Sequence, residues 1–184
     1  DSIGQPALSG RQPEPAPLML PPDSSAVGTS LQQQLMPLIE RAKAMATLQG
    51  RPWHGPDNWP AWATESARVA ATAEIVANLL ENAFRYSPSG TAIGLMALPD
   101  GLCIWDEGPP IDADERDAIF QEGVRGQRGR DRPGTGLGLA LARQLAENDG
   151  GTLELCVEPS RLAAELPQQG NAFHLTWSEP EAPT

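Results

Sequence analysis

Lysine is almost absent from this sequence, because Lys43 is the single lysine among thirteen basic residues. A Walker A phosphate-binding loop needs a lysine after its last glycine, so that class of nucleotide site is excluded. A cation that binds phosphate in this chain is therefore expected to be an arginine. The 24 acidic residues outnumber the basic ones, and a formal charge of −11 argues against a general nucleic-acid-binding protein.

Cysteine and long apolar runs are equally scarce. Cys103 and Cys156 are the only cysteines, too few for a zinc site by themselves, and both lie in apolar, strand-like runs. We expect buried, reduced thiols, and a disulfide between adjacent strands is an alternative without positive support. The sequence shows no apolar run of about 18 residues and no signal peptide, so no membrane contact is expected. Because it begins with Asp1 rather than Met, we expect a piece of a longer protein or a processed product. The expected location is the cytoplasm.

Composition divides the chain into one domain and two flanks. Residues 1–30 hold six prolines and no aromatic residue, which predicts a flexible linker. The domain is expected over 31–178, followed by a solvated tail at 179–184. Within the domain, apolar residues recur at helical spacing over 31–48, where Pro37 predicts either a kink or the true start of the helix.

Further elements follow from periodicity and from turn residues. After short strands in the Pro-rich segment at 51–64 comes a second helix that ends before Ser87. The elements expected next are a hairpin of strands at 91–98 and 101–106, a long lid-like segment with a helical piece at 112–121, a helix at 137–148, and strands at 151–158 and 171–177. This order predicts an α+β fold, a two-layer α/β sandwich with helices on one face of a mixed, mostly antiparallel sheet.

A basic, glycine-rich loop runs directly into the helix at 137–148. A helix N-terminus presents unpaired N–H groups and partial positive charge, and glycines let an anion approach the backbone closely. The residues that suit a polyphosphate here are Gly134, Gly136 and Gly138, with Arg125, Arg128, Arg130 and Arg132 just upstream. A dinucleotide-binding fingerprint is excluded, because no strand can precede these glycines. The alternative is a glycine turn in a solvated basic loop.

Two more segments carry possible chemistry. Asn78 and Asn82 project from one helical face, with Arg85 one turn on, and two carboxamide oxygens one turn apart could hold a hydrated Mg²⁺. Asp106 ends an apolar strand and could accept a hydrogen bond from an exocyclic amine such as that of adenine, while Gly108 lets the backbone turn. The alternatives are a polar stripe on an amphipathic helix and an ordinary Asx turn.

Along the chain, the paired asparagines come first, the strand that ends in Asp106 second and the glycine-rich loop last. In that order, the three segments resemble the catalytic ATP-binding domain of sensor histidine kinases, which belongs to the GHKL ATPase superfamily. The resemblance covers roughly residues 31–178. NLLENAFRYSP resembles the N box of that family, DEGPPI the first glycine box, AIFQEGVRG the F box and GTGLGLALARQLAENDGG the second glycine box.

The resemblance implies cofactors and roles. ATP and Mg²⁺ are the implied cofactors, with Asn82 on the metal, Asn78 supporting metal or phosphates, and Asp106 reading the adenine amine. The implied catalytic residues are Asn78, Asn82 and Arg85, and the implied ATP-binding residues are these three with Tyr86, Asp106, Gly108, Ile111, Arg132, Gly134, Thr135, Gly136, Leu137, Gly138 and Leu139. The chain departs from the family at Pro109, which replaces the second glycine of the first glycine box, and at Gly123, which replaces an aromatic residue of the F box.

A phosphoacceptor histidine is not recognisable. His54 lies in a Pro-rich loop and His174 alternates along an expected strand, whereas the family's acceptor lies on a helix. The resemblance therefore implies two partners: an upstream dimerisation and histidine phosphotransfer region of the same protein, and a response regulator receiver domain. Asn78 stands where GHKL hydrolases carry a catalytic glutamate, which favours transfer to protein over hydrolysis. Two alternatives are a serine kinase of the anti-sigma-factor type and a degenerate module that binds nucleotide or a partner without catalysis.

Overall fold

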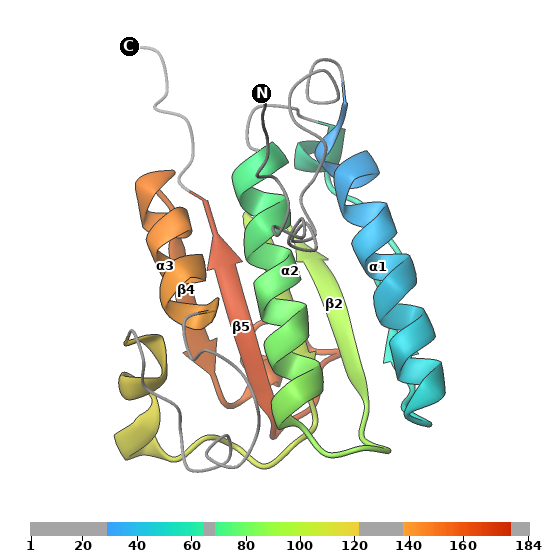
Figure 1. Cartoon of the computed structure of the whole chain (residues 1–184), viewed down its shortest axis with the longest axis vertical. Helices are drawn as coiled ribbons and strands as arrows, with labels where there is room; N and C mark the ends of the chain where they lie inside the picture. The colour runs from blue at the N-terminus through green and yellow to red at the C-terminus, as the bar shows by residue number, and fades with distance from the viewer. Residues whose placement is uncertain (1–28, 65–68, 122–137, 178–184) are drawn as a thin grey trace, which may run out of the picture.

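Three helices cover one face of a five-stranded sheet (Figure 1). The computed structural model describes residues 29–64, 69–121 and 138–177. The helices are α1 (Leu31–Leu48), α2 (Val69–Tyr86) and α3 (Gly138–Asn148), and the strands are β1 (Trp53–His54), β2 (Ile93–Leu98), β3 (Gly101–Asp106), β4 (Thr152–Cys156) and β5 (Asn171–Thr176). The strand order is β1-β2-β3-β5-β4, with β1 parallel to β2 and all other pairs antiparallel. The predicted fold class is confirmed.

The first helix begins earlier than one reading of Pro37 allowed. Ser30 caps α1 by accepting from the backbone N–H of Gln33, whose side chain accepts from the backbone N–H of Ser30 in return. This capping box satisfies N–H groups that the first turn leaves without partners, so the helix starts at Leu31. Pro37 is tolerated inside it, and the interpretation of Pro37 as the true start is wrong.

The helical piece expected at 112–121 is two short 3₁₀ turns, at Ala113–Glu115 and Ala118–Phe120. Only Ile119 and Phe120 are buried in these turns, which leaves too few apolar contacts to stabilise a continuous α-helix. Further 3₁₀ turns lie at Ala61–Thr64 and Pro159–Arg161.

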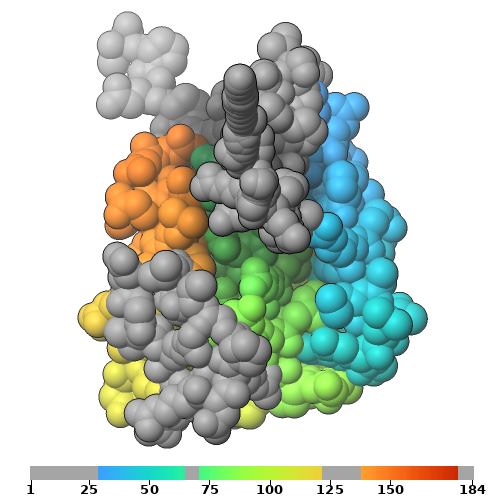
Figure 2. Space-filling view, viewed as in Figure 1, coloured from blue at the N-terminus to red at the C-terminus, as the bar shows by residue number. Residues whose placement is uncertain are grey.

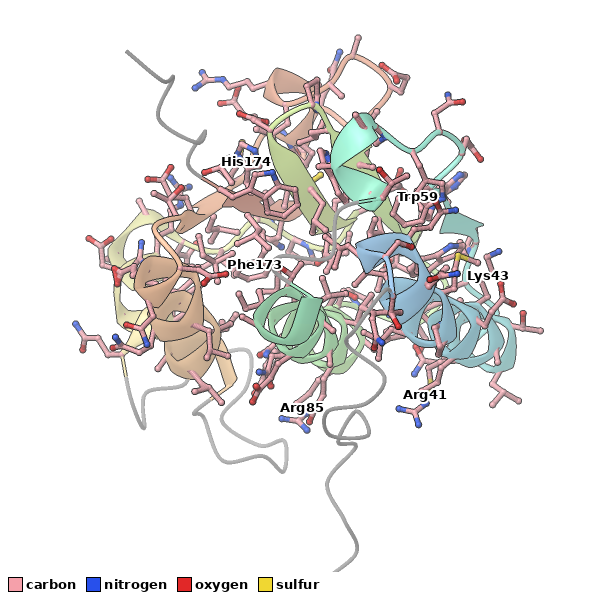
Figure 3. The ribbon with its side chains drawn as sticks, turned by 90° about the horizontal axis from the view of Figure 1, so that it is seen from above. Arg41, Lys43, Trp59, Arg85, Phe173 and His174 are labelled. Carbon is pink, nitrogen blue, oxygen red and sulfur yellow. The ribbon has the colours of Figure 1, made fainter. Side chains whose placement is uncertain are left out.

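The two faces of the sheet are packed differently. Phe173 points toward the helices and His174 points away from them (Figure 3). The main core lies on the helical side and includes Leu35, Ile39, Val76, Leu79, Leu95, Ile104 and Leu153. A smaller cluster lies on the other side, where Cys103, Trp105 and Ala172 pack with Leu166.

The cysteines carry free thiols. Cys103 on β3 is fully buried and Cys156 on β4 is half-buried, and β5 lies between those two strands. Burial is the main cause that raises the pKa of Cys103 to about 12, so this thiol stays protonated and unreactive. The expectation of a buried, free thiol is confirmed for Cys103, whereas Cys156 is free but only half-buried. In the described ranges, no helix is long and apolar enough to cross a membrane. The expected linker and tail fall outside those ranges, apart from residues 29 and 30.

Candidate functional site

The two asparagines of α2 lie one turn apart and are both half-buried. Asn82 donates from Nδ2 to the backbone oxygen of Asn78 over 2.9 Å. This bond fixes the orientation of the Asn82 amide without using its oxygen. The apolar residues of the same helix, among them Ile75, Val76 and Leu79, are buried in the core. The amphipathic pattern therefore separates the amides from the apolar face, as the sequence predicts.

The first residue of α3 lies directly against these amides. A Cβ atom at Gly138 would stand 3.1 Å from Nδ2 of Asn82 and 3.5 Å from Oδ1 of Asn78. A side chain at this position would press on the Asn82 amide, so glycine suits this approach of the two helices. The N-terminus of an 11-residue helix, with its unpaired N–H groups and partial positive charge, thus meets two polar amides. The space-filling view shows the surface of α2 between those of α3 and α1 (Figure 2).

Asp106 lies at the end of β3 with only 4% of its surface exposed. Its Oδ1 accepts from the backbone N–H of Gly108 over 2.7 Å. The Asx-type turn that the sequence allows is therefore present. That turn also holds a carboxylate in a buried position at a strand end, where a second oxygen can accept a hydrogen bond from a ligand. The two interpretations of Asp106 are compatible.

Sequence reasoning missed Asn171, the first residue of β5. It pairs with Asp106 across the sheet and is 1% exposed. Its Oδ1 accepts from the N–H of Ile111, and its Nδ2 donates to the oxygen of Pro109, both over 2.9 Å. The one available signal was a polar residue at the start of an otherwise apolar strand. That signal does not identify partners 60 residues away in sequence.

Arg51 is a second residue that sequence reasoning missed. Its guanidinium, in a residue only 4% exposed, donates to the backbone oxygen of Thr91 and to the hydroxyl of Ser87, and it lies 5.3 Å from the ring centre of Phe84. Desolvation lowers the pKa of Arg51, and attraction to Asp106 opposes that shift. An arginine remains charged under these conditions. Arg51 thus fastens the C-terminal end of α2 to the loop that enters β2.

Three other predicted site residues have local roles. Arg85 forms an ion pair with Glu81 one turn earlier and lies 5.9 Å from the ring centre of Tyr86. Its side chain points outward from the helical layer, away from the sheet (Figure 3). Leu139 is 8% exposed and packs in the main core.

Several predicted residues lie outside the described ranges. They are Arg132, Gly134, Thr135, Gly136 and Leu137, together with Gly123 and the arginines upstream of Arg132. Ile111 is described and half-buried, and its backbone oxygen accepts from Nε of Arg116 over 3.1 Å. The structure thus brings together Asn78, Asn82 and Gly138 at the start of α3, and Asp106, Gly108 and Ile111 around the start of β5.

The histidines lie in strands. His54 is in β1, where its ring stacks on Trp105 with centres 5.6 Å apart. His174 is in β5, and burial lowers its pKa, with opposing attraction from Asp100 and Glu154. The description of His54 as a loop residue is thus corrected, because β1 pairs with β2 at that position. Neither ring lies on a helix.

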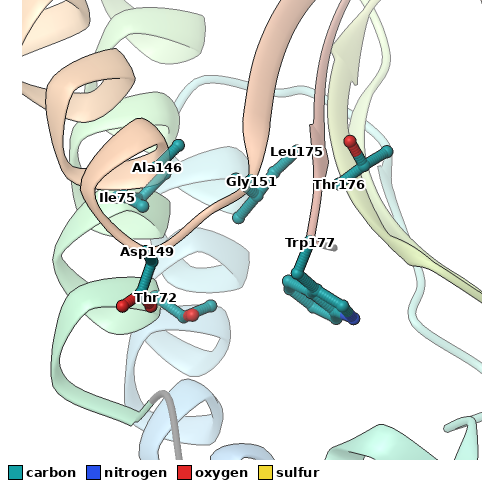
Figure 4. Close-up of a pocket in the computed structure, with 8 residues that line it drawn as sticks. All are labelled: Thr72, Ile75, Ala146, Asp149, Gly151, Leu175, Thr176 and Trp177. Carbon is teal, nitrogen blue, oxygen red and sulfur yellow. The ribbon is translucent and has the colours of Figure 1, made fainter. Parts of the chain in front are cut away.

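A small pocket lies at the other end of the α2–α3 pair (Figure 4). Its lining comes from the start of α2, the end of α3 and the end of β5: Thr72, Ile75, Ala146, Asp149, Gly151, Leu175, Thr176 and Trp177. None of the predicted site residues lines it. This pocket is therefore separate from the polar arrangement around Asn82.

Comparisons with known proteins agree on one family. Residues 68–181 match the model of the histidine kinase-, DNA gyrase B- and HSP90-like ATPases. The chain is 35% identical over 158 residues to the sensor histidine kinase Hik2 of Thermosynechococcus vestitus, a match that covers 82% of this chain and 38% of that protein. It is 34% identical over 113 residues to the sensor protein KdpD of Escherichia coli, covering 59% of this chain and 12% of KdpD. The chain thus spans well under half the length of these relatives.

Solved structures give the same result. The mycobacterial sensor histidine kinase MprB has 25% identity and a TM-score of 0.58, with 81% of this chain and 95% of that chain covered. The catalytic domain of the histidine kinase ThkA has 17% identity and a TM-score of 0.56, with 79% and 92% covered, which shows a shared fold.

Proposed function

Because the chain belongs to the family of histidine kinase-, DNA gyrase B- and HSP90-like ATPases, we propose that it transfers the γ-phosphate of ATP to a histidine that is not among residues 1–184. The domain is an ATP-binding catalytic domain of the sensor histidine kinase type. The observation that carries the proposal is the close approach of Gly138 to the amides of Asn78 and Asn82, because it brings a helix N-terminus beside two side chains whose oxygens could bind a metal ion.

The residues of this contact suit a magnesium ion that keeps most of its waters. Asn78 and Asn82 offer amide oxygens on one face, and Mg²⁺ prefers oxygen ligands and is held mainly by substrate phosphates and water. In the described part of the chain, no group of three or more His, Cys, Asp or Glu residues could hold a metal ion. When bound, the ion would neutralise charge on the phosphates.

The chain's own groups would position the nucleotide. Asp106 would accept a hydrogen bond from the adenine amine, and the N-terminus of α3 would face the phosphates. Asn82 and Asn78 would orient the triphosphate through the metal. Arg85 stands near the same end of α2 and would exchange its ion pair with Glu81 for a phosphate contact, because that pair is exposed enough to be weak.

The amide side chain of Asn78, which lies against Gly138, favours transfer to a protein acceptor over hydrolysis. The residue at 78 is an amide, which cannot take a proton from water at neutral pH. The carboxylate of Glu81 is exposed and lies about 100° around the helix from Asn82, so it does not face the same site. A histidine acceptor is favoured over a serine because the relatives that match are named sensor histidine kinases. We also propose that a receiver domain of a response regulator takes the phosphoryl group onward, and that the domain works in the cytoplasm.

The test combines residues 1–184 with a separate histidine-bearing helical region and γ-labelled ATP. We expect Mg²⁺-dependent label on the added region that is lost in acid, because phosphohistidine is acid-labile. We expect no label on residues 1–184 alone. Acid-stable label would point to the serine kinase alternative, and Mg²⁺-dependent ATP binding without any transfer would point to the degenerate module. Label on His54 would contradict the proposal directly.

A further inference from the structure

We propose that Asn171 is a positioning residue that holds the segment Pro109–Ile111 in place, so that the backbone beside Asp106 is ordered before a nucleotide arrives. This inference rests on the proposed function, because it assigns the adenine end of the same site. It concerns a residue on β5 that lies 60 and 62 positions from the two residues that it bonds in the glycine box.

The segment needs an external support because of its sequence. Pro109 and Pro110 have no N–H groups, so the backbone cannot donate a hydrogen bond between Gly108 and Ile111. The N–H of Gly108 is taken by Asp106 over 2.7 Å, and the next N–H, that of Ile111, is taken by Asn171. Both ends of the proline pair are thus held by side chains from β3 and β5, which pair with each other at this end of the sheet.

An asparagine suits this position because it offers a donor and an acceptor on one planar group. Asn171 uses both, accepting from Ile111 and donating to Pro109, each over 2.9 Å. The backbone next to Asn171 is held close to β3. Gly170 lies so close to Asp106 that a Cβ atom there would stand 2.2 Å from the backbone oxygen of Asp106. Asn171 pairs with Asp106 in the sheet, so the Asp106 carboxylate and the Asn171 amide are held by the same pair of strands.

Burial makes the support strong. Asn171 is 1% exposed, so removing its amide takes away the buried acceptor of the Ile111 N–H and one donor to the oxygen of Pro109. Either the N–H of Ile111 stays unsatisfied, or the segment moves to reach water. Pro109 and Pro110 are themselves exposed, so moving costs less than staying unsatisfied. Removing the Asn171 amide is therefore expected to loosen the Pro109–Ile111 segment rather than to unfold the domain.

The test separates the adenine end from the phosphate end of the site. We would measure binding of Mg-ATP and of Mg-tripolyphosphate, the latter by competition, to the wild-type chain and to Asn171→Ala. We expect ATP affinity to fall about tenfold while tripolyphosphate affinity changes less than twofold. Hydrogen exchange at the Ile111 amide should accelerate in the same variant without nucleotide.

Two further variants keep the test decisive. Asn171→Asp keeps the side-chain volume and the acceptor for Ile111 but cannot donate to Pro109, so it should also lose ATP affinity selectively. Leu153→Ala is the matched control. Leu153 is buried in β4 and pairs with Leu175, toward the other end of β5, so this substitution should lower the stability of the domain without touching the Pro109–Ile111 segment. That variant should leave the ratio of the two affinities unchanged.

The outcomes distinguish the two proposals. A wild-type chain that binds neither ligand would refute the proposed function and this inference together. A wild-type chain that binds ATP, with both Asn171 variants binding it equally well, would refute the inference alone. Equal losses for ATP and tripolyphosphate would also refute it, because they would show a general structural role.

Discussion

The two ends of the domain are built from the same helices and strands but are closed in opposite ways. We call the end that contains Asn82, Asp106, Gly138 and Asn171 the nucleotide end, and the other the far end. At the nucleotide end, polar groups face one another and glycine provides the space. At the far end, apolar and aromatic side chains make most of the contacts, and Trp177 lines the small pocket there.

The far end is closed by several independent contacts. The ring of Trp62 meets that of Trp177 edge-on with centres 4.8 Å apart, and its Nε1 donates to the oxygen of Leu98 over 2.6 Å. The backbone N–H of Trp177 donates to the oxygen of Asp100 over 3.1 Å. Helix α3 ends in a left-handed glycine, Gly150, which lets the next N–H return to the last turn. These contacts stabilise the fold at the far end.

The comparison teaches where stability and chemistry come from in this chain. The nucleotide end keeps two amides half-buried and a carboxylate buried, an arrangement that polar side-chain bonds and Arg51 hold in place. The far end contributes packing free energy through contacts that polar groups would weaken. Substitutions at the two ends should therefore separate loss of function from loss of stability.

The largest effect is expected for Asn82→Ala. If Asn82 binds the metal and orients the phosphates as we propose, removing its amide should slow phosphotransfer on the order of 100-fold or more. Its bond to the Asn78 backbone is local to the helix, and alanine favours helices, so the free energy of unfolding should change by less than about 1 kcal/mol. Label transfer and urea unfolding measure the two quantities.

The matched control is Asn148→Ala at the far end of α3. Asn148 is exposed and accepts only from Gln144 on the same helix surface, so transfer should stay at the wild-type rate. A folded Asn82→Ala protein with normal transfer would contradict the metal assignment.

Arg51→Met should have the next largest effect, on stability. The variant keeps the apolar contact with Phe84 but leaves the oxygen of Thr91 and the hydroxyl of Ser87 without their charged donor. The free energy of unfolding should fall by about 2–3 kcal/mol, measured with urea.

The comparison for this variant is Arg161→Met. Arg161 forms an exposed pair with Glu158, and such pairs contribute little, so the change should stay within about 0.5 kcal/mol. Equal effects of the two substitutions would show that the buried cation does not hold the nucleotide end.

Asp106→Asn should have a smaller and more selective effect. The amide can still accept from Gly108, but it can present an N–H where the adenine amine needs an acceptor. ATP affinity should fall about tenfold while GTP affinity stays within twofold, measured by calorimetry. Asp100→Asn, at the far end of the same hairpin, should change neither affinity. Equal losses for the two nucleotides would mean that Asp106 does not read the base.

The smallest effect is expected from pH. Burial lowers the pKa of His174 in the folded state below its ordinary value of 6.5, so the unfolded chain binds more protons between these two values. The free energy of unfolding should therefore decrease as the pH falls through about 6.5 and level off below the folded pKa. His174→Gln should lose that part of the decrease and leave ATP affinity unchanged. Parallel pH curves for the two proteins would contradict this account.

Much of the architecture could be predicted from the sequence because it depends on near neighbours. Helical spacing predicted α1 and α2, turn residues predicted the β2–β3 hairpin, and the asparagine pair predicted a polar helical face. The 112–121 segment was predicted less well, since its apolar residues are too few for periodicity to separate an α-helix from 3₁₀ turns. The functional roles of Asn78, Asn82 and Asp106 stay predictions.

The sequence by itself determined which residue types stand at each element end: the amides on α2, the carboxylate at the end of β3, and the glycine that begins α3. The tertiary structure alone decided that Gly138 lies against Asn82, that Asn171 supports the proline pair, and that Arg51 fastens the end of α2. These contacts join residues about 35 to 60 positions apart. Spacing along the chain does not predict these contacts, because they depend on how the strands pair and how the helices pack.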